Sequence, residues 1–214
     1  MAEPQRVVLA TTNPHKVAEF RAIYADLPVA LVIPTDLSLH VSVDETGTTF
    51  EQNAVLKALA FAEAAGLPAL ADDPGLEIDA LGGEPGVYSA RWAGEATSYP
   101  ERFRILFRRL AAVPDDQRTA RYRCAIALAE PRPRGLYQIV EGTLEGAITR
   151  EPRGSGGFGY DPIFLVPSLG RTVAELPPDE KHAISHRGRA ARAAREPLLH
   201  LLARRPTPSI PTTS

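Results

Sequence analysis

The segment 69–94 constrains this chain most, because it begins as an apolar strand and runs directly into two carboxylates. Its first residues read ALADDPG, so Asp72 and Asp73 follow three small or apolar residues. Pro74 and Gly75 come next, and since both disfavour helices and strand interiors, we expect the strand to end there. Ligands of α/β proteins bind beyond the carboxyl ends of strands, and paired carboxylates suit Mg²⁺ carrying a phosphate chain. An Asx turn in a surface loop is the alternative for an isolated Asp-Asp-Pro-Gly.

The composition limits the classes of function. A chain of 214 residues can bury a substantial core, in one large domain or in two lobes that share a cleft. The formal net charge of -2 gives no basic surface for a nucleic-acid polymer or an anionic membrane. Cys124 is the single cysteine, which excludes an intrachain disulfide, and its apolar neighbours predict a core thiol. We therefore expect a cytoplasmic protein that binds neither membranes nor nucleic-acid polymers.

The order of the predicted strands and helices indicates an α/β fold with a mixed sheet. Apolar runs at 6–10 and 30–33 lack alternation, as buried parallel strands do. The segments 118–129 and 136–143 flank the turn-forming sequence PRPRG, which predicts an antiparallel pair. Apolar residues at helical spacing predict helices at 14–27, 49–65, 100–110, 180–187 and 189–202.

Two local predictions concern glycines and arginines. Gly142 and Gly146 predict a short turn after the strand at 136–143, because glycine punctuates regular structure. In the helix at 100–110 the apolar residues share one side, so the arginines are expected on a solvated face. Those arginines are Arg102, Arg104, Arg108 and Arg109.

The strand at 6–10 leads into a helix start that is suited to bind phosphate. Asn13 is a good N-cap residue and Pro14 fits the first helical position. Backbone N–H groups at a helix N-terminus attract anions, and Lys16 adds a positive charge. The glycines of a Walker A loop are missing, so a merely capped helix is the alternative. The whole segment comprises Thr11, Thr12, Asn13, Pro14, His15 and Lys16.

Three further features carry ligand-binding chemistry. The loop 153–162 contains four glycines, which allow close backbone approach to a ligand, and its aromatic residues offer flat faces to a base. In the helix at 49–65, Asn53 and Lys57 lie four residues apart and share a face. His186 and Arg187 supply adjacent donors. The structural alternatives are a packed loop, a solvated lysine and a capped helix start.

In this order, the segments closely resemble the inosine/xanthosine triphosphate pyrophosphatases, which hydrolyse non-standard purine nucleoside triphosphates to monophosphate and pyrophosphate. The resemblance covers roughly residues 6–203 and is most specific in Gly-Gly-Phe-Gly-Tyr-Asp-Pro (156–162) and Ser-His-Arg (185–187). It implies one domain at 1–204, with an elongated mixed β-sheet flanked by helices and two lobes around a nucleotide-binding cleft. It also implies Mg²⁺, purine nucleoside triphosphate substrates and a homodimer. The tail 205–214 is predicted to be disordered.

The resemblance also implies roles for individual residues. Asp73 and Glu45 would bind the metal, and the catalytic residues would be Asp73, Asp72 and Lys57. Phe158 would stack on the base, while Lys181, His186 and Arg187 would contact the oxo edge of the purine. The full set of implied substrate-binding residues is Thr11, Thr12, Asn13, Pro14, His15, Lys16, Pro74, Phe158, Gly159, Tyr160, Asp161, Lys181, His186 and Arg187.

Pro74 departs from the family pattern, in which serine usually follows the paired acids. Proline lacks both the hydroxyl and the backbone N–H, so we expect retained activity with weaker substrate binding. One alternative function is a related nucleotide pyrophosphatase that prefers modified pyrimidines and does not need His186 and Arg187. Another is a nucleotide-binding protein whose catalysis is impaired at Pro74.

Overall fold

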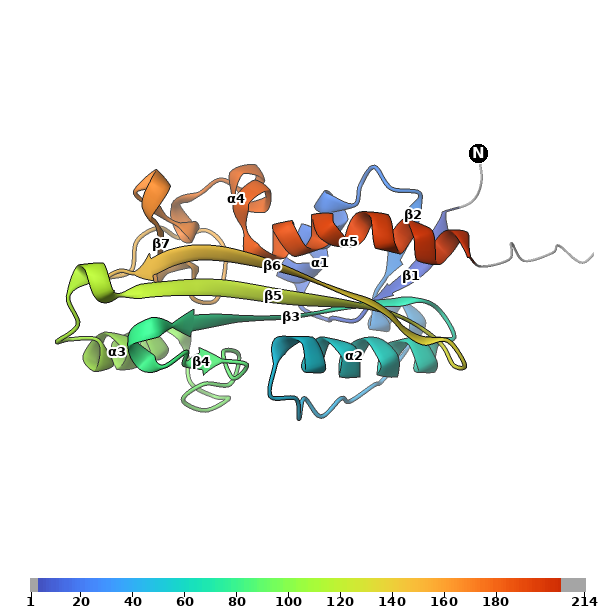
Figure 1. Cartoon of the computed structure of the whole chain (residues 1–214), viewed down its shortest axis with the longest axis horizontal. Coiled ribbons are helices and arrows are strands. Elements are labelled where there is room, and N and C mark those ends of the chain that lie inside the picture. Colours follow the sequence, from blue (N-terminus) through green and yellow to red (C-terminus); the bar gives the residue numbers. More distant parts are fainter. Residues whose placement is uncertain (1–3, 205–214) are drawn as a thin grey trace, which may run out of the picture.

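The fold is an elongated mixed β-sheet with helices packed against it, which confirms the predicted fold class (Figure 1). The computed structural model describes residues 4–204, so the tail predicted to be disordered lies outside the described residues. Among the described helices, none has the length and apolar character that crossing a membrane requires. The helices are α1 (Pro14–Ile23), α2 (Phe50–Ala65), α3 (Tyr99–Arg109), α4 (Pro178–Ile184) and α5 (His186–Ala203).

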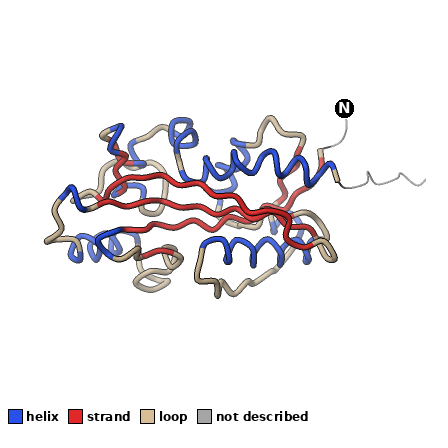
Figure 2. Tube along the Cα trace, in the orientation of Figure 1, coloured by secondary structure: helices blue, strands red, loops and turns tan. Residues whose placement is uncertain are grey.

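The strands form one sheet in the order β2-β1-β3-β5-β6-β7-β8, with β4 paired to β3. β1 is parallel to β2 and β3, and the other pairs are antiparallel, as a mixed sheet requires. The long strands β3, β5 and β6, of 10, 12 and 14 residues, pair side by side along the long axis of the molecule (Figure 2). The strands are β1 (Gln5–Leu9), β2 (Val29–Val32), β3 (Ala69–Ile78), β4 (Pro85–Gly86), β5 (Thr119–Glu130), β6 (Gly135–Ile148), β7 (Phe164–Val166) and β8 (Arg171–Thr172).

One edge of β3 is open in its middle. β5 pairs with β3 over its whole length, but on the other edge β1 reaches only Ala69 and Leu70. On that same edge, β4 pairs only with Leu76 and Glu77. Residues 71–75 therefore have no partner strand on this side, and both predicted acids lie in the gap.

The predicted end of this strand at Pro74 is wrong, because β3 continues through Pro74 and Gly75. Leu70 accepts a hydrogen bond from the Ala10 N–H at 2.9 Å, and the Leu76 N–H donates to Ser89 Oγ at 2.9 Å. The even-numbered residues of β3 thus turn their backbone groups away from β5. The N–H that Pro74 lacks would face the open edge, so proline removes no hydrogen bond between strands.

Two hydrophobic clusters cover opposite faces of the sheet. Leu70 packs in a cluster with α1 and α5, whereas its neighbour Ala71 packs in a cluster with α2. This alternation is what a strand buried on both faces produces. A third cluster joins α3 to the other half of the sheet, through residues such as Leu106 and Leu76. The core is thus divided among three clusters, and the predicted division into two lobes stays a prediction.

The predicted turn at Gly142 and Gly146 is also wrong, because β6 runs without interruption through both glycines. A Cβ atom at Gly142 would collide with the backbone of His186 and Ala190, and one at Gly146 would collide with Phe164. Glycine here allows α5 and β7 to approach β6 closely. Both positions do require glycine, but the reason is close packing against neighbouring elements and not a turn.

Arg102 corrects the prediction of a fully solvated arginine face on α3. Its side chain is buried and donates hydrogen bonds to the carbonyl oxygens of Ser89, Ala90 and Gly94. Arg104, on the same helix, is 70% exposed, as expected. Arg102 therefore holds the loop 89–94 against α3, and part of this loop lines the pocket described next.

Candidate active site

A pocket lies at the open edge of β3. The loop before α1, the middle of β3, the segment after β4, the loop 158–161 and the start of α5 all contribute to its wall. It brings together most of the predicted site residues, from seven separate stretches of sequence. Those that line it are Asn13, Lys16, Glu45, Lys57, Asp73, Pro74, Phe158, Gly159, Tyr160, Asp161, Lys181, His186 and Arg187.

Five predicted residues do not line the pocket. Asp72 is buried behind it, with 2% of its surface exposed. The Thr11 hydroxyl accepts a hydrogen bond from the Asn13 N–H, and Thr12 is exposed. Pro14 begins α1, and the His15 ring stacks on Phe158 with 5.1 Å between ring centroids. The predicted catalytic role of Asp72 stays a prediction, as do the predicted substrate contacts of the other four residues.

The start of α1 forms as its sequence predicts. The Asn13 side chain accepts hydrogen bonds from the N–H groups of His15, at 2.9 Å, and Lys16, at 3.4 Å. Pro14 occupies the first turn of the helix. Because these bonds fix the first turn, the Lys16 side chain projects to β3, where Nζ lies 2.9 Å from Asp72 Oδ1.

Asp72 is fully engaged with two cations on one face of the sheet. Oδ1 accepts from Lys16 Nζ at 2.9 Å, and Oδ2 accepts from Arg187 Nε at 3.0 Å. Burial alone raises the pKa of Asp72, but the charges of Lys16 and Arg187 outweigh it and hold this pKa well below its usual range. Asp72 is therefore a charged structural anchor at neutral pH.

Asp73 points to the opposite face and has different partners. Its Oδ1 lies 2.7 Å from Lys57 Nζ, and Asn53 Nδ2 lies 3.4 Å from Oδ2, which confirms the predicted shared face of Asn53 and Lys57. Lys57 Nζ also lies 3.0 Å from Glu45 Oε1. Burial raises the pKa of Asp73, and the charge of Lys57 offsets this only in part, since the negative charge of Glu45 raises the pKa further.

The donor chemistry around Asp73 fits a hard divalent cation. Asp73 and Glu45 both approach the same ammonium group, so two carboxylates already converge on one positive charge. Within residues 4–204 there is no group of three or more His, Cys, Asp or Glu side chains that could hold a metal. A Mg²⁺ ion held here would take its remaining oxygen ligands from substrate phosphates and water, as this ion commonly does.

The other end of the pocket is aromatic and cationic. Lys181 Nζ lies 4.7 Å from the centroid of the Phe158 ring, and Arg187 Cζ lies 5.4 Å from it. His186 is buried, and its Nδ1 has no hydrogen-bond partner among the described residues. Burial, followed by the charges of Arg187 and Lys181, lowers the pKa of His186 well below its usual value. The imidazole is therefore neutral at pH 7.

Asp161 organises the glycine-rich loop from inside. Its Oδ2 accepts from the Phe158 N–H at 2.9 Å and from Lys181 Nζ at 3.0 Å. Gly157 has a φ of +71°, and a Cβ atom there would collide with the Asp161 carboxylate. The loop thus needs glycine at 157 for both its conformation and its packing.

Sequence reasoning missed a buried acid, Glu19, at the centre of the charged cluster. Its Oε2 lies 2.5 Å from an Arg187 guanidinium nitrogen, and its Oε1 lies 2.9 Å from Lys181 Nζ. Helical spacing could have predicted this placement, because Glu19 follows Lys16 by three residues on the same helix and so lies on the same face. Tyr122 and Ser89 also line the pocket and were not predicted as site residues.

Comparisons with known proteins show which family this chain resembles. The Ham1 family model matches residues 7–197. The dITP/XTP pyrophosphatase of Streptomyces coelicolor is 50% identical over 191 residues, which cover 88% of this chain and 94% of the relative. That of Shigella flexneri is 49% identical over 186 residues, covering 87% and 94%.

Solved structures give the same result. A HAM1 protein from Coxiella burnetii superposes with a TM-score of 0.83 at 46% identity, covering 92% of this chain and 99% of that one. The nucleoside-triphosphatase, or dITP/XTP pyrophosphatase, of Mycobacterium abscessus superposes with a TM-score of 0.73 at 42% identity, covering 91% and 100%. The family match and these identities, over almost the whole described chain, show that it belongs to the Ham1 family.

Proposed function

We propose that this chain hydrolyses non-standard purine nucleoside triphosphates, such as dITP, ITP and XTP, to the monophosphate and pyrophosphate. One observation carries the proposal: a single pocket has acids and lysines for a phosphate chain at one end and an aromatic, hydrogen-bonding wall at the other. The names of the curated relatives support it, since they are dITP/XTP pyrophosphatases.

At the phosphate end, Lys16 and Lys57 supply positive charge for the triphosphate. Asp73 is the proposed base, because its raised pKa and single strong cation partner leave it able to orient water and accept its proton. Asp72 is unsuited to this role since both of its oxygens already accept from cations. Mg²⁺ would be held by Asp73 and Glu45 and would supply charge that polarises the phosphate.

At the base end, we propose that Phe158 stacks on the purine and that His186 and Lys181 contact its oxo edge. The Lys181 side chain donates hydrogen bonds, and a donor that faces the six-position oxygen of hypoxanthine or xanthine would face the amino group of adenine instead. A site built to hydrogen-bond one substrate group can reject an analogue that lacks it by ~10⁴-fold. Arg187 is bound to Asp72 and Glu19, so its contacts support a role in positioning.

The test is pyrophosphate release from ITP, XTP, ATP and GTP with Mg²⁺, each with an EDTA control. We expect metal-dependent release from ITP and XTP and little from ATP. Equal rates with all four nucleotides would contradict the proposed base recognition. Binding of ITP without release would favour the alternative of a nucleotide-binding protein. Faster release from modified pyrimidine triphosphates in the same assay would favour the alternative of a pyrophosphatase that prefers pyrimidines.

Magnesium dependence, a homodimer and a cytoplasmic location also stay proposals, which rest on the family resemblance. Light scattering coupled to gel filtration tests the homodimer, since it should give twice the mass of one chain. Replacement of Mg²⁺ by Ca²⁺ tests the metal. Ca²⁺ accepts longer and more variable oxygen distances, so we expect binding with much slower turnover.

A further inference from the structure

Tyr122 joins the two parts of the pocket wall that the proposed function assigns to the base. It lies on β5, is 6% exposed and lines the pocket. Its hydroxyl donates to Asp161 Oδ1 at 3.2 Å. Its ring stacks on the His186 ring, with 4.5 Å between centroids and 23° between planes. One side chain thus touches both the glycine-rich loop and the start of α5.

The hydroxyl of Tyr122 completes the environment of a buried carboxylate. The other oxygen of Asp161 holds the Phe158 N–H and Lys181 Nζ, so the carboxylate sets the position of both groups. Without the tyrosine hydroxyl, Oδ1 would lose its donor and the carboxylate could rotate about its last bond. Phe158 and Lys181 would then be held less firmly.

The ring of Tyr122 fixes the imidazole by contact alone. On its other side the ring stacks on Phe164, at 4.2 Å between centroids, so it cannot shift away from His186. The His186 Nδ1 atom has no hydrogen-bond partner among the described residues. The orientation of the imidazole therefore depends on this stack and on the position of its backbone at the start of α5.

We propose that Tyr122 is a positioning residue for base recognition, acting through Asp161 with its hydroxyl and through His186 with its ring. This inference rests on the proposed function of the pocket. In the sheet, Tyr122 pairs with Leu76, whereas Asp73 pairs with Ala125, three positions further along β5. A change at Tyr122 should therefore alter binding of the base far more than the chemical step.

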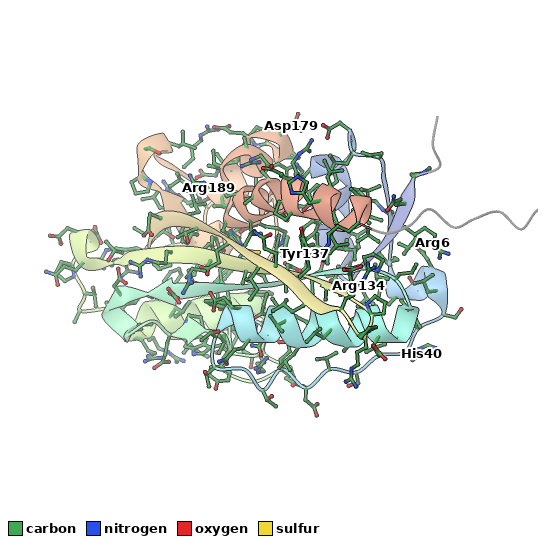
Figure 3. The ribbon with its side chains drawn as sticks, turned by 45° about the vertical axis from the view of Figure 1, so that its right-hand side comes forward. Arg6, His40, Arg134, Tyr137, Asp179 and Arg189 are labelled. Atoms are coloured by element: carbon green, nitrogen blue, oxygen red, sulfur yellow. The ribbon has the colours of Figure 1, made fainter. Side chains whose placement is uncertain are left out.

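The first experiment compares Tyr122→Phe with wild type in ITP hydrolysis. Loss of one hydrogen bond should raise KM about three- to tenfold, with kcat within about twofold. Tyr137→Phe is the matched control, because Tyr137, which Figure 3 labels, lies on β6 and is not among the residues that line the pocket, and the change also removes one hydroxyl. A KM for Tyr122→Phe equal to that of the control would overturn the role of the hydroxyl.

A double-mutant cycle tests whether Tyr122 acts through Asp161. In an Asp161→Asn background, Tyr122→Phe should change KM by less than about twofold, because the acceptor that it serves is already altered. If the two substitutions multiply as independent effects, Tyr122 does not act through Asp161 and the proposal fails. Calorimetry can repeat the cycle without turnover, by measuring the Kd of inosine monophosphate for wild type, the two single variants and the double variant.

A second variant tests the ring and guards against loss of folding. Tyr122→Leu removes the stack on His186, and we expect the ratio of kcat/KM for ITP over ATP to fall about tenfold. This ratio is internal to each sample, so it does not depend on the folded fraction. An unchanged ratio would overturn the role of the ring. Failure of the proposed function is separate, since it would appear as absent ITP hydrolysis in wild type.

Discussion

Asp72 and Asp73 are neighbours in one strand, yet they have opposite electrostatic situations. Asp72 faces Lys16 and Arg187 on the α1 and α5 side, and its pKa is held low. Asp73 faces the α2 side, where it shares the charge of Lys57 with Glu45, and its pKa is raised. The difference shows that the strand places the carboxylate of Asp72 among structural partners and leaves the carboxylate of Asp73 accessible from the pocket.

The separation arises from the pleat of β3. Successive side chains of a strand point to opposite faces, so two adjacent acids cannot share one set of partners. The open edge of the strand then gives Asp73 access to the pocket, while Asp72 stays behind it. Experiments that exchange or remove these acids should therefore affect different properties.

The largest effect is expected from Asp73→Asn. Removal of the proposed base should lower kcat for ITP by ~10²- to 10⁴-fold, because asparagine cannot accept the proton of water. The free energy of unfolding should change by less than about 1 kcal/mol, since burial already disfavours the charge at this position. Steady-state kinetics and urea denaturation measure both. A kcat within tenfold of wild type would remove Asp73 from the proposed mechanism.

Asp72→Asn should act mainly on stability. Lys16 and Arg187 would lose a buried carboxylate partner, and breaking such a pair costs about 3–5 kcal/mol. We therefore expect a lower unfolding midpoint in urea, together with a smaller loss of kcat than Asp73→Asn causes. If Asp72→Asn unfolds at the wild-type midpoint, the carboxylate is not the anchor that its contacts indicate.

The two acids should also differ in pH dependence. The lowered pKa of Asp72 stabilises the fold fully above its unfolded value of about 3.9, and this contribution is lost as pH falls through the folded pKa. Because the pKa of Asp73 is raised in the folded protein, this residue adds to folding stability at pH values below about 3.9. That contribution is lost as the pH rises through the folded pKa. The stability gap between wild type and Asp72→Asn should thus shrink in acid. A gap that is constant from pH 3 to pH 7 would contradict this.

The smallest effect is expected from Pro74→Ser. Position 74 turns its backbone nitrogen to the open edge, so serine would add an N–H and a hydroxyl at the pocket without disturbing the pairing with β5. We expect kcat/KM for ITP to rise by at most about tenfold, the value of one added hydrogen bond. Pro74→Ala separates the two groups, because alanine restores only the N–H. No change with either variant would mean that this position makes no useful contact with substrate.

Local signals in the sequence predicted local structure well. The Asn13 cap is confirmed by its two hydrogen bonds, and the face shared by Asn53 and Lys57 is confirmed by their common partner Asp73. These features depend on residues within one or two turns of a helix, which periodicity encodes directly.

Predictions failed where a residue's surroundings come from distant parts of the chain. Arg102 was expected in solvent but is buried against three carbonyl oxygens of the loop 89–94. Gly142 was expected in a turn but lies within β6, where α5 packs against it. Arginine in solvent and glycine in a turn are the usual cases, so composition favours them until the packed neighbour is known.

The sequence by itself determined the fold class, the helix that carries Lys57 and the chemistry of the two acids and the glycine-rich loop. The tertiary structure alone decided how the acids differ, because their partners are far away along the chain. Arg187 is separated from Asp72 by 115 residues and from Glu19 by 168 residues. Local periodicity cannot predict such pairs. Their members meet only after hydrophobic packing has fixed the distance between α5 and the sheet.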